Sequence, residues 1–307
     1  MVTPFDRRDF LKMSAIGLAT LLNDTSFLVG AHPSKLAFST LGCPDWDLNK
    51  VIEFARLNNY QGIEIRGIQR QLDLSKCPDF STTANRKSSL QKMKDNDLKF
   101  VNLGSSCTLH FPAGAERMKN IDEGKRFIEI ASDLHCPFIR VFPNNFPKDQ
   151  DKEQTLDLIS SGINELSQFA KGSSVDVLLE THGDLVKADD IDSLMKKVNR
   201  RGTGLIWDVT NMWTITNESP AAVYPKIASY IKHTHIKDAY FDKGKWNYVL
   251  LGKGSVPIFE AIDLLRKDNY KGYYSFEWEK LWHPEIDAPE LALADFPSAI
   301  SNHISKK

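Results

Sequence analysis

The sequence predicts a single α/β domain with the (β/α)8 barrel fold, and three features of the chain support this prediction. Short apolar runs alternate with longer amphipathic stretches, and eight such pairs follow one another between residues 35 and 303. The strand segments are almost continuously apolar, as expected for parallel strands that are buried on both faces. The 307 residues also leave room for one barrel, which typically needs about 250.

Four strand–helix pairs are expected in the first half of the barrel. The spacing predicts strand 35–41 with helix 48–59, strand 62–66 with helix 84–96, strand 100–104 with helix 115–134, and strand 138–142 with helix 153–169. Helix 84–96 is the most polar of these segments, and its apolar side rests on Leu90 and Met93, which lie three residues apart on one helical face.

Four further pairs are expected in the second half. They are strand 175–181 with helix 188–198, strand 204–209 with a short helix 220–228, strand 231–237 with helix 256–267, and strand 272–277 with a closing helix 289–303. An open, doubly wound sheet is the alternative to a closed barrel. No glycine-rich GxGxxG turn follows the first strand, so the dinucleotide site of such sheets has no support. Since no linker, repeat or low-complexity segment interrupts the pattern, we expect one barrel domain over residues 32–307.

The N-terminus has the arrangement of a twin-arginine (Tat) export signal. Arg7 and Arg8 precede an uncharged, moderately apolar run of about ten residues, which is too short to span a bilayer. Small residues at 29–31 suit cleavage after Ala31. We therefore expect a Tat-type signal over residues 1–31, the Tat export machinery as a partner, and a periplasmic location. The alternative is a frayed N-terminal helix with a chance arginine pair.

Composition and charge exclude some function classes. Hydrophobic residues make up 41% of the chain and charged residues 26%, which argues against disorder. The net charge of −1 gives no basic footprint for nucleic acid, so we expect no nucleic-acid partner. A homo-oligomer is compatible with the sequence. The four cysteines form no CxxC pair and are expected to be reduced, buried thiols, although export would permit a disulfide.

Acidic side chains follow the late strands, where a barrel places its active site. Glu180, Asp208 and Glu277 each come directly after an apolar run. Three carboxylates at one barrel mouth repel each other unless a cation lies between them. His235 has inward parity on its strand and adds a nitrogen ligand. The sequence therefore predicts one divalent metal ion (Mn²⁺, Mg²⁺, Co²⁺ or Zn²⁺). The alternative is a set of buried salt bridges to basic side chains, namely Arg66, Arg140 and Lys237.

Several motifs together resemble the xylose isomerase-like TIM barrel family, whose members are described as sugar phosphate isomerases or epimerases. The resemblance covers about residues 35–285 and rests on segments 39–44, 62–66, 180–182, 207–208, 233–238 and 276–279. It implies that Glu180, Asp208, His235 and Glu277 bind one metal ion. Related ketose 3-epimerases carry a histidine three residues after the strand-six aspartate. This chain has Asn211 there, which leaves the substrate contacts and the epimerase reaction open.

The chemistry expected of such a site starts with the removal of a weakly acidic proton next to a carbonyl group. A metal on the sugar oxygens stabilises the resulting enediolate, and two carboxylates on opposite faces can remove and return the proton. Glu180 and Glu277 are the expected catalytic pair. We expect a metal-dependent isomerase or epimerase acting on a free or keto sugar. A 3-keto-glycoside lyase is the main alternative, and a non-catalytic sugar-binding barrel or an AP-endonuclease-like enzyme is less favoured.

A further group of side chains at the strand ends is expected to contact the carbohydrate substrate. Its members are His182, Lys237, Glu64, Arg140, His110, Asn211 and Trp278. The charged members also have a structural interpretation, in which they form ion pairs: Lys237 with Asp238 or Glu279, Glu64 with Arg66, and Arg140 with Glu180.

Overall fold

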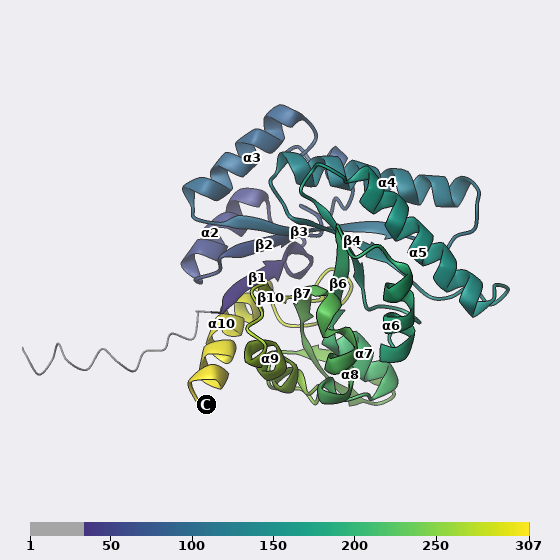
Figure 1. Cartoon of the computed structure of the whole chain (residues 1–307). Helices are drawn as coiled ribbons and strands as arrows, with labels where there is room; N and C mark the ends of the chain where they lie inside the picture. Colours follow the sequence, from purple (N-terminus) through teal and green to yellow (C-terminus); the bar gives the residue numbers. More distant parts are fainter. Residues whose placement is uncertain (1–33, 307) are drawn as a thin grey trace, which may run out of the picture. The chain divides into compact units, whose positions relative to one another are not determined.

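A computed structural model describes residues 34–306 and confirms the closed parallel barrel (Figure 1). Eight strands follow one another around the barrel in the order β1-β10-β7-β6-β5-β4-β3-β2. The barrel closes where β1 pairs in parallel with β10, with Leu36 opposite Tyr274 and Phe38 opposite Phe276. The export signal predicted for residues 1–31 lies outside the described residues.

The first half of the barrel contains four strand–helix pairs close to those expected. Its elements are β1 (Lys35–Ser39), α2 (Leu48–Leu57), β2 (Gly62–Ile65), α3 (Thr83–Asp95), β3 (Lys99–Thr108), α4 (Ala115–Asp133), β4 (Phe138–Phe142) and α5 (Lys152–Phe169), with short 3₁₀ helices at Thr40–Gly42 and Leu74–Lys76. Side chains of Asp47, Thr82 and Asp151 accept backbone N–H groups at the starts of α2, α3 and α5. These N-caps fix where the three helices begin.

The second half repeats the pattern with two additions. Its elements are β5 (Asp176–Glu180), α6 (Ala188–Lys197), β6 (Thr203–Asp208), α7 (Val209–Thr216), α8 (Pro220–Ile227), β7 (Ile231–Ile236), β8 (Asp238–Asp242), β9 (Lys245–Val249), α9 (Ile258–Lys267), β10 (Tyr273–Phe276) and α10 (Pro289–Ser305), with a 3₁₀ helix at Ala228–Tyr230. Helix α7 and the antiparallel hairpin β8–β9 were not expected from the sequence. The third strand is also longer than expected and ends at Thr108.

The unexpected hairpin is anchored by one aspartate. Asp238 accepts backbone N–H groups from Ala239, Gly252, Gly254 and Val256 at 2.8–3.3 Å. A Cβ atom on Gly254 would lie 2.1 Å from an Asp238 carboxylate oxygen, and Gly252 has a φ of +79°. Only glycine suits both positions, because one is too crowded and the other left-handed. Gly252 and Gly254 are therefore required for the conformation of the loop that follows the hairpin.

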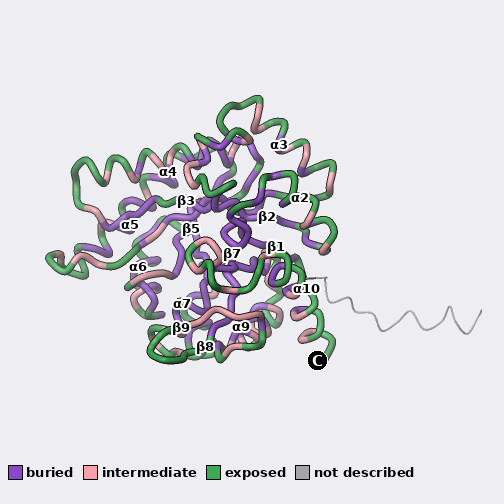
Figure 2. Tube along the Cα trace, turned by 180° about the vertical axis from the view of Figure 1, so that it is seen from behind, coloured by how far each residue is buried: buried purple, intermediate pink, exposed green. Residues whose placement is uncertain are grey.

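The core lies inside the barrel and between the strands and the surrounding helices, as the buried strands of Figure 2 show. Aromatic stacking packs helix α10 against the barrel, since the ring centroids of Phe276 in β10 and Phe296 in α10 lie 4.7 Å apart. All four cysteines are buried and free, and burial raises the pKa of Cys136 to about 12. In the described part of the chain, no helix is both long and apolar enough to cross a membrane.

Candidate metal centre and cavity

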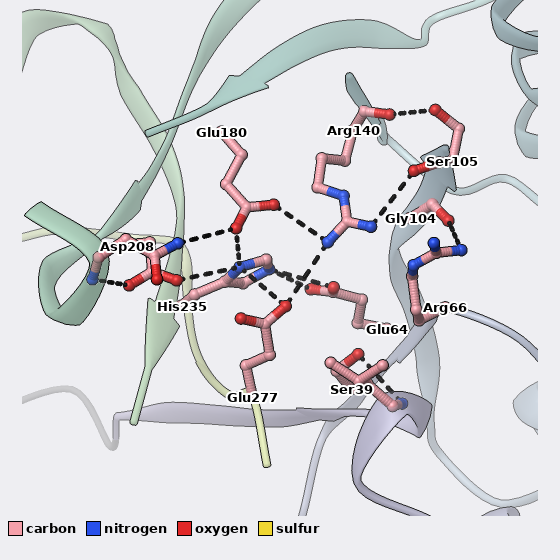
Figure 3. Close-up of polar contacts among 12 residues, drawn as sticks. Ser39, Glu64, Arg66, Gly104, Ser105, Arg140, Glu180, Asp208, His235 and Glu277 are labelled. Carbon is pink, nitrogen blue, oxygen red and sulfur yellow. Dashed lines mark hydrogen bonds and ion pairs between the residues drawn. The ribbon is translucent and has the colours of Figure 1, made fainter. Parts of the chain in front are cut away.

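The four predicted metal ligands converge at the C-terminal end of the barrel (Figure 3). Glu180 ends β5, Asp208 ends β6, His235 lies in β7, and Glu277 directly follows β10. One ligand atom from each lies within 4.8 Å of all the others, and all four side chains are buried. His235 Nδ1 is 3.2 Å from Glu277 Oε1, 3.4 Å from Glu180 Oε1 and 4.0 Å from Asp208 Oδ2. The structure thus brings this set together.

The strand register explains why these side chains meet. Asp208 pairs with His235 across β6 and β7, and His235 pairs with Ser275 across β7 and β10. Alternate residues of a strand share a face, so Glu277 points to the same side as Ser275. Asp208 is held further by its own helix, because its Oδ1 accepts the Asn211 N–H at 2.8 Å as the N-cap of α7.

Three buried atoms of this group have no hydrogen-bond partner within the described residues. They are His235 Nδ1, Glu180 Oε2 and Asp208 Oδ2, although the two carboxylate oxygens lie 3.0 Å from Arg140 Nη1 and 2.7 Å from Lys237 Nζ. A buried nitrogen lone pair that faces carboxylate oxygens is unfavourable unless a proton or a cation lies between them. The donor set of three carboxylates and one imidazole suits a divalent metal ion, so the residues fit the predicted cofactor.

The charges around the four side chains also favour a bound cation. Four buried carboxyl groups, those of Glu180, Asp208, Glu277 and Glu279, form ion pairs with Arg140 and Lys237. Burial raises the pKa of Asp208 to about 7, and the neighbouring carboxylates add to this in spite of Lys237. A divalent cation among these carboxyl groups would favour their ionised forms.

A buried carboxylate beneath the site determines which nitrogen of His235 faces it. Glu64 accepts hydrogen bonds from His235 Nε2 at 3.1 Å, His233 Nε2 at 2.9 Å and Ser275 Oγ at 3.3 Å. Burial alone would raise the pKa of Glu64, but His235 and the two histidine hydrogen bonds hold it below its ordinary value. With the proton on Nε2, the Nδ1 lone pair of His235 faces the carboxylates. Glu64 is therefore an orienting group for this ligand.

Arg140 and Lys237 neutralise part of the carboxylate charge. Arg140 Nη1 lies 3.0 Å from Glu180 Oε2 and 3.5 Å from Glu277 Oε1. Lys237 Nζ lies 2.7 Å from Asp208 Oδ2, 2.6 Å from Glu277 Oε2 and 2.7 Å from Glu279 Oε1. Burial would lower the pKa of Lys237, but these three carboxylates raise it well above its ordinary value. Both cations therefore hold the carboxylates in place.

A cavity of about 270 Å³ opens onto this group. Its lining comprises Leu41, Arg66, Arg140, Phe142, Glu180, His182, Lys237, Glu277, Glu279 and Trp282. Ligand sites commonly span about 300–1,000 Å³. A cavity just below that range, with a mostly charged lining, suits one small polar molecule such as a single sugar ring.

The predicted substrate contacts divide into two groups. His182, Arg140 and Lys237 line the cavity, and Asn211 Nδ2 lies 3.5 Å from Glu180 Oε1 beside it. Three others lie outside the lining: Glu64 is bound to the two histidines, His110 Nδ1 lies 3.2 Å from the Pro143 carbonyl oxygen, and Trp278 Nε1 donates to the Asp287 carbonyl at 3.1 Å. Their contact with a substrate therefore stays a prediction.

Five lining residues were not expected as part of the site: Leu41, Arg66, Phe142, Glu279 and Trp282. Arg66 and Glu279 each follow a predicted inward residue by two positions, so the strand period could have identified them. Trp282 lies in a loop and is 54% exposed, and no periodicity indicates its position. Sequence reasoning treated the two charged residues only as partners in ion pairs.

Comparisons with known proteins agree with this arrangement. A family model described as "Xylose isomerase-like TIM barrel" matches residues 52–295. An inosose dehydratase from Clostridium beijerinckii is 28% identical over 148 residues, which are 42% of this chain and 48% of that protein. The chain thus spans about half the length of the curated relatives it matches.

Solved structures share the fold over nearly the whole barrel. The IOLI protein, solved with a zinc atom bound, superposes with a TM-score of 0.74 at 18% identity, over 89% of this chain and 98% of that chain. A D-psicose 3-epimerase from Clostridium cellulolyticum H10, solved with D-tagatose, has a TM-score of 0.69 at 16% identity, over 88% and 98% of the two chains. Likeness at these identities establishes a common fold.

Proposed function

Because this chain belongs to the xylose isomerase-like TIM barrel family, we propose that it is a metal-dependent sugar isomerase or epimerase. Its substrate would be a free or keto-modified sugar that loses a proton next to a carbonyl group. The observation that carries the proposal is the convergence of three carboxylates and one histidine on a sugar-sized cavity. The matched proteins include one named as a dehydratase and one named as an epimerase, and both names refer to small sugar-like molecules.

The metal would be held by Glu180, Asp208, His235 and Glu277. A divalent cation there would supply a Lewis acid that stabilises negative charge on the sugar oxygens as the proton leaves. The mixed oxygen and nitrogen donors accommodate Mn²⁺, Mg²⁺, Co²⁺ or Zn²⁺.

Glu180 and Glu277 are the proposed proton carriers. Burial would raise the pKa of Glu180, but Arg140 and His235 lower it, and His235 and Lys237 act in the same way on Glu277. Both carboxylates are therefore ionised and able to accept a proton. They reach the cavity from β5 and from the end of β10, so one can take a proton that the other returns on the opposite face of the sugar. That sequence of steps inverts a carbon centre.

A lyase reaction is the second candidate, and Glu279 favours it. This carboxyl group lines the cavity, and burial together with Glu277 raises its pKa in spite of Lys237. A carboxyl group with a raised pKa is better suited to donate a proton to a leaving hydroxyl or glycosidic oxygen after the same first step. A match to an inosose dehydratase is consistent with this reaction.

Hydrogen–deuterium exchange tests the shared first step. In D₂O with Mn²⁺, a panel of ketohexoses and 3-keto-glycosides should include a substrate that gains deuterium at the carbon next to the carbonyl. NMR would also show whether a stereoisomer or an eliminated product forms. Removing the metal with EDTA should stop the exchange, and re-adding Mn²⁺ should restore it. Metal-independent exchange, or no exchange with any sugar, would count against the proposal.

We further propose that the protein reaches the periplasm through its twin-arginine signal. Replacing both Arg7 and Arg8 with lysine should leave the protein in the cytoplasm at its precursor length, because Tat recognition requires the arginine pair. Cell fractionation followed by immunoblotting would measure this, with Lys12→Gln as a control that keeps the pair. Equal periplasmic amounts of the paired-lysine variant and the wild type would contradict the proposal.

A further inference from the structure

Arg66 is a buried cation in the cavity wall that forms no ion pair within residues 34–306. It follows β2 directly, is 6% exposed and lines the cavity. Its Nη1 donates to the Gly104 carbonyl oxygen at 3.2 Å, and its Nη2 donates to Ser106 Oγ at 2.9 Å. Within residues 34–306 its guanidinium group forms no ion pair, whereas Arg140 and Lys237 each contact at least two carboxylates.

An unpaired buried charge is costly unless a ligand completes it. A guanidinium group carries five N–H donors, of which Gly104 and Ser106 engage two. Burial and the charge of Arg140 lower the pKa of Arg66 to about 10, which still leaves it cationic at neutral pH. The group therefore presents free donors at the edge of the cavity, and its charge is met only by the more distant carboxylates of Glu123, Glu180 and Glu277.

Gly104 of β3 lets the side chains of Arg66 and Arg140 pack side by side. A Cβ atom on Gly104 would lie 2.9 Å from Arg66 Cδ and 3.2 Å from Arg140 Nη2, so both arginines pack where only glycine fits. In Figure 3, Arg66 lies beside Gly104 on the side of Arg140 away from Asp208. Arg140 is balanced by Glu180 and Glu277, which leaves Arg66 as the cation available to a ligand.

We propose that Arg66 binds a carboxylate group of the substrate, so that the preferred substrates are sugar acids such as keto-uronates. This inference rests on the proposed function, because it assigns the substrate class of the same cavity. The planar guanidinium fork matches a carboxylate with two parallel hydrogen bonds. A carboxylate is favoured over a doubly charged phosphate group because Arg66 is the one Arg or Lys of the described cavity lining that forms no ion pair.

Matched ligands would test this assignment on the full chain loaded with Mn²⁺. The ligands are D-fructose, D-fructuronate, in which a carboxylate replaces the terminal CH₂OH group, and D-fructose 6-phosphate. Titration calorimetry should show that the wild type binds the uronate at least about tenfold more tightly than the neutral ketose. Arg66→Gln should lower that ratio by about 10–100-fold, because a charge-assisted hydrogen-bonded pair is lost. Arg66→Lys should keep part of the preference, because it retains the charge without the fork.

Arg70→Gln is the matched control. Arg70 follows in the same loop but is exposed and paired with Asp45, so its loss removes one positive charge without changing the cavity. The ratio should not change in this variant. Circular dichroism and Mn²⁺ binding would verify that each variant folds. In exchange assays, the Arg66→Gln loss should appear in the KM for the uronate more than in kcat.

Three results would overturn the assignment: no binding of the uronate, a wild-type preference for the neutral or the phosphorylated ketose, or an equal loss for all ligands in Arg66→Gln. An equal loss is what a purely structural tie between β2 and β3 predicts. Failure of the proposed reaction looks different. Selective, Arg66-dependent binding of the uronate without deuterium exchange would support the Arg66 site and reject the proposed reaction. Deuterium exchange with neutral ketoses alone would support the reaction and reject the Arg66 site.

Discussion

Replacing Glu180 with glutamine should lower the rate of α-proton exchange by at least about 10²–10⁴-fold at saturating metal. The amide keeps the size of the side chain but cannot accept the proton. Glu180 is buried at the end of β5 and lines the cavity, 3.4 Å from His235 and 3.0 Å from Arg140, where it can reach a bound sugar. NMR of the substrate in D₂O would measure the loss directly. Sugar binding should persist, which separates an enzyme from a sugar-binding barrel.

Glu165→Gln is the matched control for this variant. Glu165 lies on α5, is about half exposed and pairs with Lys125, far from the barrel mouth in the chain's fold. The same chemical change there should leave exchange within a factor of about two. If Glu180→Gln kept more than a tenth of the wild-type exchange rate, Glu180 would not be the base. Glu277→Gln would then be the variant expected to stop the reaction.

Asp208→Asn should abolish most of the stabilisation that Mn²⁺ gives the protein. A ligand at 100 times its Kd stabilises the folded state by about 2.7 kcal/mol, and losing one charged ligand removes most of that effect at the same metal concentration. Without metal, the variant should be at least as stable as the wild type. Burial raises the pKa of Asp208 to about 7, so holding it ionised costs folding free energy that is absent below its unfolded pKa and grows as the pH rises to about 7. An amide never carries that charge.

Thermal unfolding with and without Mn²⁺, at pH values from 5 to 8, would measure both effects. Asp176→Asn is the control, because Asp176 lies at the opposite end of β5 and pairs with Lys232. It should keep the metal-induced rise in Tm. An unchanged rise in Asp208→Asn would show that Asp208 is not a ligand, and a lower metal-free Tm would contradict the electrostatic account.

Strand periodicity and strand ends allowed most of the fold and the metal group to be predicted. The four ligands follow apolar runs, and such positions converge in a barrel whatever the loops do. Helix α7 was not predicted, because a side-chain cap starts it and the sequence pattern gives no sign of a helix there. Helix α7 starts at Asp208, which acts as its N-cap, so an apolar strand passes into a helix without an intervening turn signal.

The arrangement around the ligands depended on contacts that no spacing reveals. Glu64 was expected to face the substrate or to pair with Arg66, yet it binds His233 and His235 from across the barrel. Trp278 was expected to contact the substrate, and the structure buries its ring against Phe276 while its Nε1 donates to the Asp287 carbonyl oxygen. Pairings between strands that are distant in sequence decide such contacts.

Anomalous X-ray diffraction from crystals of the Mn²⁺-loaded protein would test the central claim most directly. The account predicts one strong anomalous peak among Glu180, Asp208, His235 and Glu277, with His235 bound through Nδ1 while its Nε2 stays on Glu64. A peak between Glu64, His233 and His235 instead, which also lie close enough to share an ion, would contradict it. So would the absence of any peak at saturating metal.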